Sequence, residues 1–380
     1  MRITATFKSF LKSEQSSGIL LIACTLLSLT LSNFFLKSNY IHIWEYQFAS
    51  HSLEYWINDG LMTLFFLQIG LELKRELYIG ELSQVKKALL PVFAAFGGMI
   101  IPACIYLFFN FGTTTQNGFG IPMATDIAFA LALLSLLGKN VPIALKVFLT
   151  ALAVIDDLGA IIIIAVFYTQ HIVWMNLFLA FIVFVFLLFL KKRGIQHLAI
   201  YLVGGIIMWY FMLNSGVHAT ITGILLAFTI PFGKGRKESS FSKLLHLLEK
   251  PVSYLIVPLF ALANTAIAIQ SDWKTSLFEK YAIGIFYGLL IGKPIGITLF
   301  SYIAVQLKIV KLPVGIHWKM IFGAGILGGI GFTMSIFITL LAFTDQNSVS
   351  TSKIIIMISS LTAGIIGYLY LKSLLKKATT

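Results

Sequence analysis

The sequence predicts an all-α integral membrane protein with about twelve transmembrane helices. Three observations support this fold class: 58% of the 380 residues are hydrophobic, only 11% are charged, and apolar runs of helix-spanning length recur from end to end. Soluble domains carry about 25% charged residues, and roughly twenty apolar residues cross a bilayer. No polar stretch is long enough for a soluble domain, so we expect residues 1–380 to form a single transmembrane domain.

Each expected span follows an apolar run, and the basic residues between the runs give its orientation. All but five of the lysine and arginine residues fall at the termini or in alternate loops, including the clusters 191–193 and 234–237. By the positive-inside rule, both termini are cytoplasmic and the number of spans is even. The spans are expected near residues 18–36, 57–73, 88–110, 119–137, 142–168, 172–190, 197–213, 217–231, 252–269, 281–305, 320–343 and 352–371.

The formal net charge of +13 could indicate a nucleic-acid ligand. The basic residues instead lie between the spans, with no basic stripe and no aromatic stacking platform. We therefore expect contact with membrane lipid headgroups and no nucleic-acid partner.

The fourth expected span is interrupted near its middle. Gly120 and Pro122 break the apolar run, and Thr125 and Asp126 follow before an intact apolar helix resumes. Irregular backbone at membrane depth survives only where it is buried in protein or lines water, so this span is expected to be broken and functional.

The fifth span carries two adjacent acids, Asp156 and Asp157. Counted from Val141, they lie about 22–24 Å along a helix, near the centre of a bilayer about 30 Å thick. One carboxylate there costs at least about 2.5–3.5 kcal/mol, and two neighbouring ones repel each other. The pair is therefore expected to bind a cation and to exchange protons.

The tenth span holds Lys293, about 18 Å from Tyr281 along the helix. Pro294 follows it and is expected to bend the helix. An unpaired ammonium at this depth is expensive, so we expect Lys293 to pair with one of the three buried aspartates. Holding the fold and carrying a proton are both open roles for this lysine.

The eleventh span repeats the pattern of the fourth. A glycine cluster at 325–331 leads to Thr333 and then to an intact apolar helix. Spans three to five and ten to twelve thus form two triplets, each with its broken span in the centre. Three crossings per copy is an odd number, so the two copies run in opposite directions, as inverted-topology repeats.

These stretches together resemble the NhaA-type sodium/proton antiporters, from about Ser17 to Tyr370. The inverted repeat is a known property of that family. The matching segments are WINDGLMTLFFLQIGLELKREL, ATDIAFALALLSLLG, ALAVIDDLGAIIIIAVFY, SGVHATITGILLAF, LIGKPIGI and GILGGIGFTMSIFI.

The resemblance implies a role for each central residue. Asp157 would be the principal ligand of the transported Na⁺, and Asp156 would share the ion or proton duty and pair with Lys293. Thr125 and Asp126 would lie where the broken helices cross, with Asp126 and Lys293 compensating the charge of the helix ends. The sequence alone leaves open which aspartate faces the ion, and it leaves open a purely structural role for Asp126.

The resemblance also implies an activity: an electrogenic antiporter that exports sodium or lithium for protons, with two protons per sodium ion. Such a protein is no enzyme and needs no cofactor besides its transported ions. It would act in sodium and pH homeostasis in the bacterial inner membrane. A sodium-coupled solute symporter or a passive cation channel of the same architecture remains the alternative. A homodimer formed through the external segment before residue 56 is a further expectation.

A last cluster lies at the cytoplasmic end of the second span. The resemblance assigns Glu72, Arg75 and Glu76 to a pH-sensing funnel, against the simpler interpretation as a solvated helix end. The partner segment, KLLHLLEKPVSYL, keeps His246 but has Leu245 and Glu249 where the family often has an acid and a second histidine. Because glutamate does not titrate near neutral pH, a shifted or flatter pH profile is expected.

Overall fold

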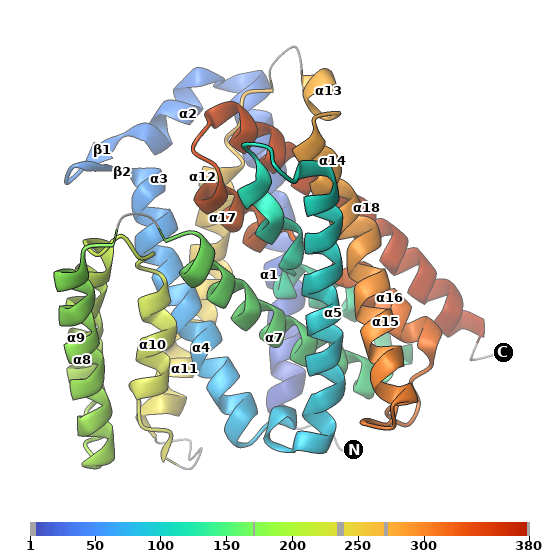
Figure 1. The fold of residues 1–380 in the computed structure, drawn as a ribbon, viewed down its shortest axis with the longest axis horizontal. Helices are drawn as coiled ribbons and strands as arrows, with labels where there is room; N and C mark the ends of the chain where they lie inside the picture. The colour runs from blue at the N-terminus through green and yellow to red at the C-terminus, as the bar shows by residue number, and fades with distance from the viewer. Residues whose placement is uncertain (1–4, 170–171, 234–238, 270–272, 378–380) are drawn as a thin grey trace.

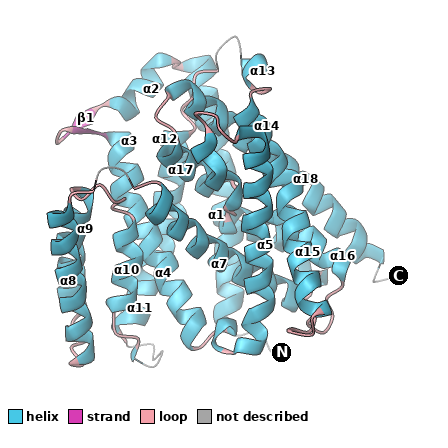
Figure 2. Ribbon diagram, in the orientation of Figure 1, coloured by secondary structure: helices cyan, strands magenta, loops and turns pink. Residues whose placement is uncertain are grey.

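The computed structural model describes residues 5–169, 172–233, 239–269 and 273–377, and in these ranges the chain is almost entirely helical (Figures 1 and 2). The expected basic cluster at 234–237 lies outside the described residues. The only strands in the described part form one two-residue hairpin, in which Gln47 pairs with Ser52 and Phe48 with His51.

The elements follow one another along the chain with short connections. In order they are α1 Ala5–Thr30, η1 Leu31–Phe35, α2 Ser38–Glu45, β1 Gln47–Phe48, β2 His51–Ser52, α3 Leu53–Tyr55, η2 Trp56–Leu61, α4 Met62–Tyr78, η3 Glu81–Ser83, α5 Val85–Asn110, η4 Gln116–Met123, α6 Ile127–Leu136, η5 Gly138–Asn140, α7 Ile143–Phe167, α8 Trp174–Lys192, α9 Leu198–Leu213, α10 Ile221–Thr229, α11 Ser240–Pro251, η7 Val252–Ile256, α12 Val257–Asn264, α13 Trp273–Ser276, α14 Lys280–Tyr287, η8 Gly288–Gly292, α15 Lys293–Gln306, α16 Trp318–Gly328, α17 Phe332–Ala342 and α18 Gln346–Lys377.

Eight helices in the described ranges are long and apolar enough to cross a membrane. The pair α16 and α17, bent by 49° at its break, is a ninth candidate if the two helices form one span. Segments η2–α4, α9 and α10 match the remaining expected runs but are shorter or more polar. The expectation of an all-α, multi-pass membrane protein is confirmed.

Two glycine contacts bring helices unusually close together. A Cβ added at Gly97 of α5 would lie 2.1 Å from the carbonyl oxygen of Gly296 in α15. A Cβ added at Gly223 of α10 would lie 2.3 Å from the carbonyl oxygen of Thr63 in α4. Small residues at such crossings let apolar helices pack in a membrane, where lipid is as apolar as a leucine side chain. The first contact fixes α15, and with it Lys293, against α5.

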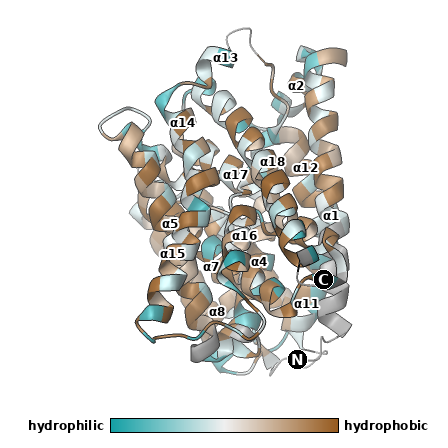
Figure 3. Ribbon diagram, turned by 90° about the vertical axis from the view of Figure 1, so that its right-hand side faces the viewer, coloured by the Kyte–Doolittle hydropathy of each residue, from teal (hydrophilic) through white to brown (hydrophobic). Residues whose placement is uncertain are grey.

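The start of α1 and the last turns of α18 lie in the half of the molecule away from the β1–β2 hairpin (Figure 1). Viewed from the side, the long helices run between the end that holds the hairpin and the opposite end, and hydrophobic residues cover much of their length (Figure 3). We call the two ends the hairpin end and the terminal end.

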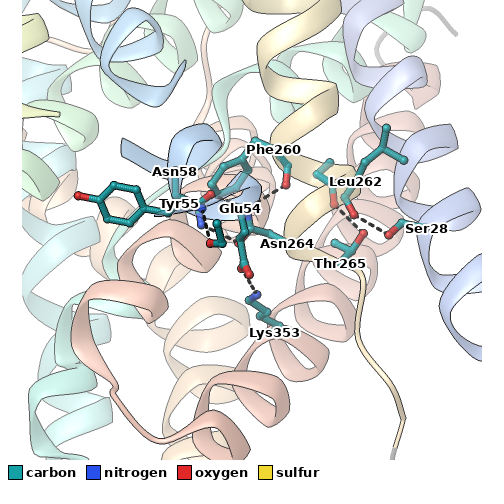
Figure 4. Close-up of polar contacts among 11 residues, drawn as sticks. Ser28, Glu54, Tyr55, Asn58, Phe260, Leu262, Asn264, Thr265 and Lys353 are labelled. Carbon is teal, nitrogen blue, oxygen red and sulfur yellow. Dashed lines mark hydrogen bonds and ion pairs between the residues drawn. The ribbon is translucent and has the colours of Figure 1, made fainter. Parts of the chain in front are cut away.

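A polar cluster ties three helices together toward the hairpin end; it consists of Glu54, Asn58, Asn264 and Lys353, which we call the hairpin-end cluster (Figure 4). Asn264 Nδ2 donates to Asn58 Oδ1 at 2.7 Å. Lys353 Nζ of α18 lies 3.6 Å from Glu54 Oε1 of α3. The side chain of Lys353 is 8% exposed and that of Glu54 is 34% exposed, so this ion pair is only partly shielded from solvent.

Candidate functional site

The two interrupted segments meet each other inside the protein. Residues 124–126 connect η4 to α6, and residues 329–331 connect α16 to α17. The Asp126 amide donates to the carbonyl of Ile330 at 2.6 Å. Backbone groups released by one break are thus satisfied by the other, as buried irregular backbone requires.

Asp126 joins the starts of two half-helices. Its Oδ1 accepts from the amide of Phe129 at 3.0 Å, which caps α6. Its Oδ2 accepts from the amide of Thr333 at 3.1 Å and from the Thr333 hydroxyl at 2.5 Å, at the start of α17. A carboxylate at this point offsets the partial positive charge of both helix N-termini. Only 2% of Asp126 is exposed, so the contacts substitute for water.

Asp156, Lys293 and Thr125 form a compact buried group. Lys293 Nζ lies 2.5 Å from Asp156 Oδ2 and 3.0 Å from Thr125 Oγ1. Neither charged side chain is exposed. The Thr125 hydroxyl lies 2.8 Å from both Asp156 Oδ2 and the Gly328 carbonyl, and its single proton can go to only one of them at a time. Lys293 therefore pairs with a buried aspartate, as expected.

Asp157 faces a different environment from its neighbour. Successive helical residues point about 100° apart, so Asp157 cannot share the Lys293 contact equally. It is 1% exposed and lines a cavity of about 60 Å³ together with Glu72, Asp126 and Thr333. Its Oδ1 has no hydrogen-bond partner among the described residues. A buried carboxylate oxygen without a partner is suited to accept a proton or a hard cation.

The expected funnel residues also come together. Arg75 lies 3.5 Å from Glu76 on α4, and His246 lies 3.6 Å from Glu249 on α11. Helix α11 packs against α4, and the charge of Glu249 acts on Glu72. His246 is the most exposed of these groups, at 59% of its side chain. Glu72 belongs to the cavity beside Asp157, whereas His246 lies on the surface.

The sequence interpretation missed two buried polar residues on α4. Lys74 is not part of a solvated helix end: it is fully buried, and its Nζ donates to the carbonyls of Ala227, Phe228 and Ile230 at the end of α10. Gln68 lines the cavity and donates to Glu72 at 2.8 Å. Helical spacing could have indicated both positions. Lys74 lies three residues after Leu71 and Gln68 lies four residues before Glu72, so each shares a helix face with the residue one turn away.

Within the described ranges, no three His, Cys, Asp or Glu side chains gather into a resident metal site. Three acids, Glu72, Asp126 and Asp157, line the same cavity.

Comparison with known proteins agrees with this geometry. The sequence model of the family described as Na+/H+ antiporter 1 matches residues 8–371. A Na(+)/H(+) antiporter NhaA of Flavobacterium psychrophilum is 61% identical over 376 residues, covering 99% of this chain and 98% of the relative. The NhaA of Cytophaga hutchinsonii is 58% identical over 99% of this chain and 97% of the relative, and that of Helicobacter pylori is 44% identical over 99% and 97%.

These relatives are transporters, and the match extends through both broken segments, the aspartate pair and Lys293. The chain is a multi-pass bacterial membrane protein, and it belongs to the Na+/H+ antiporter 1 family, which includes the NhaA antiporters.

Proposed function

We propose that this protein is an electrogenic antiporter that exports sodium or lithium ions in exchange for protons. The observation that carries the proposal is the division of labour between two adjacent buried acids. Asp156 is paired with Lys293 through Oδ2, while Asp157 has no ion-pair partner among the described residues and lines the cavity. Each of the two acids keeps its Oδ1 without a hydrogen-bond partner among the described residues. A site with this charge binds either a small cation or protons.

Competition for Asp157 is the coupling step. Sodium is a hard cation that prefers oxygen ligands, which carboxylates and water supply. Protonation removes the negative charge and releases the metal, and sodium binding displaces the proton. Because a bare carboxylate is costly in the bilayer centre, only a loaded or protonated site crosses easily.

Asp156, Lys293 and Thr125 supply the second exchangeable charge. When sodium binds beside Asp156, the carboxylate attracts both the metal ion and the Lys293 ammonium. Its attraction for the ammonium is then weaker, and a proton can leave this group of three residues. Two protons inward for one sodium ion outward moves one net charge, worth roughly 2.3 kcal/mol per 100 mV. Asp126 offsets the helix ends while this charge changes.

The proposal also includes the number of spans, the inverted repeats and the orientation in the membrane. The nine candidate crossings together with η2–α4, α9 and α10 would make twelve spans in a single domain. The triplets containing η4–α6 and α16–α17 would be inverted copies whose broken helices cross. Both termini would then be cytoplasmic, in the inner membrane, and the exposed hairpin offers a contact for a homodimer.

We also propose that the funnel residues Glu72, Arg75, Glu76, His246 and Glu249 adjust activity to pH. The His246–Glu249 contact, at 3.6 Å, lies on α11, which packs against the helix that carries Glu72. Because Glu249 stands where the family often has a second histidine, we expect a shifted or flatter pH profile.

Purified protein in liposomes tests the activity, with internal pH and membrane potential monitored while sodium is added. Sodium should collapse an imposed pH gradient and generate a potential of the sign set by net proton charge movement. Asp157→Asn should abolish exchange, whereas the exposed control Asp345→Asn should retain it. Sodium flux without proton counterflow indicates a channel, and sodium entry that requires a solute indicates a symporter; either result overturns the proposal.

A further inference from the structure

Gln68 is a polar residue in an otherwise apolar part of α4. It is 7% exposed, and its Nε2 donates to Glu72 Oε1 at 2.8 Å. Its Oε1 is shielded from solvent and has no hydrogen-bond partner among the described residues. Leaving a buried amide oxygen unpaired is unfavourable, so its presence calls for an explanation.

The bond to Glu72 fixes the orientation of the amide. An ionised carboxylate can only accept hydrogen bonds, so the amide NH₂ must face Glu72. The carbonyl oxygen therefore points away from Glu72. The opposite orientation would place the amide oxygen of Gln68 against a carboxylate oxygen of Glu72, and two acceptors cannot form a hydrogen bond. Only one orientation of the amide therefore fits while Glu72 is ionised.

Gln68 lines the same cavity as Asp157 and Glu72. The cavity, of about 60 Å³, has room for a few water-sized groups. Its wall holds two oxygens without partners in the described structure, Gln68 Oε1 and Asp157 Oδ1. Ser253 and Thr333 add hydroxyl groups to the same wall.

An amide oxygen is a neutral hard ligand for cations. Amide carbonyls coordinate hard ions in proteins, and carbonyl oxygens can replace the hydration shell of an alkali cation without adding negative charge. Such a ligand attracts a metal ion but gains nothing from a proton at neutral pH. It would therefore favour sodium over protons in the competition for Asp157.

We propose that Gln68 is a cation-binding residue of the transport path, which takes over part of the hydration shell of sodium or lithium between Glu72 and Asp157. This inference rests on the proposed antiport function. It assigns to Gln68 an effect on cation affinity, distinct from the charge exchange at Asp157. A role limited to holding Glu72 in place is the competing explanation.

The two explanations differ in what a substitution changes. If Gln68 binds the cation, Gln68→Leu should raise the KM for sodium by roughly tenfold, the size of losing one good ligand. The maximal rate at saturating sodium should stay close to that of the unaltered protein, while loss of the bond to Glu72 moves the pH midpoint under either explanation. If Gln68 only holds Glu72, the pH midpoint should shift and the KM measured at each optimum should be unchanged.

The experiment uses full-length protein in liposomes with sodium or lithium, and calorimetric titration of the same ions into purified protein. Gln306→Leu is the matched control, because it makes the same chemical change at an exposed residue at the end of α15. Gln68→Met, which keeps side-chain length but lacks a good hard ligand, replaces Gln68→Leu if that variant does not fold.

Weakened binding in the Gln68 variant that folds, with Gln306→Leu unaffected, supports the inference. Unchanged KM and unchanged calorimetric affinity overturn it, as does a pH shift alone. If the unaltered protein shows no sodium-driven proton movement, the proposed function fails instead, so the two failures are distinguishable.

Discussion

Among the described residues, two lysine–carboxylate pairs connect helices, and their surroundings differ sharply. At the centre, Lys293 and Asp156 are 2.5 Å apart with no exposure of either side chain. In the hairpin-end cluster, Lys353 and Glu54 are 3.6 Å apart and Glu54 is one-third exposed. The first pair lies next to a second carboxylate, Asp157, which the second pair lacks.

The difference shows what turns an ion pair into an exchange site. At the hairpin end, water can reach the carboxylate of Glu54, which is 34% exposed, although Lys353 is nearly buried, so this pair is shielded from solvent less completely than the central one. In the centre, removing one partner leaves a charge with no replacement. When Lys293 is the partner withdrawn, a mobile cation or proton can neutralise the Asp156 carboxylate in its place, and the neighbouring carboxylate of Asp157 gives it a place to bind.

Breaking the central pair should have the largest effect. Asp156→Asn leaves the Lys293 ammonium buried without a carboxylate and should lower the free energy of unfolding by about 3–5 kcal/mol. Thermal unfolding in detergent measures this loss. The double variant Asp156→Asn with Lys293→Gln should recover a large part of it, and equal instability of the single and double variants would contradict the assigned pairing.

Breaking the hairpin-end pair should have a smaller effect. Glu54→Gln keeps an amide oxygen as an acceptor beside the nearly buried Lys353, at a position that water reaches, so it should lower the free energy of unfolding by less than Asp156→Asn does. Sodium-driven exchange in liposomes should persist, because neither residue touches the central cavity. If Glu54→Gln lost as much transport as Asp156→Asn, the two ion pairs would not differ in their role in transport, and the comparison would fail.

The smallest effect is expected at Asp345, in the loop before α18. Hydrogen bonds from the amide and hydroxyl of Ser348, both 2.9 Å long, lower the pKa of this exposed carboxyl. A lowered pKa means that the bonds stabilise the fold above the unfolded value, about 3.9, and are lost as pH falls through the folded pKa.

Asp345→Asn should therefore change the melting temperature slightly and by a constant amount between pH 6 and 9, measured by dye-based thermal unfolding. The difference should disappear only in acid. A difference that grows across neutral pH would mean that Asp345 couples to a group titrating there, and would place a pH-sensitive site at the hairpin end.

Much of the architecture could be predicted from the sequence, because membrane burial leaves strong local signals. The acids at 156–157 and the glycine and proline clusters stand out against apolar runs, and the structure brings these segments together. The sequence could not show that Asp126 caps two helices, or that Asn58 meets Asn264, since both depend on how distant segments pack. The burial of Lys74 was missed because it stands in a charged cluster at a helix end, for which a solvated end was one of the two interpretations. Gln68 was missed because only the charged residues of this helix were considered.

The shared carboxylate of Asp126 has a mechanical consequence. The first turns of α6 and α17 both donate amide hydrogen bonds to this one side chain. If either half-helix moved away, its first-turn amide would lose its acceptor. We therefore expect α6 and α17 to move together as one rigid unit. Access to alternate sides of the membrane would then come from surrounding helices sliding past that unit.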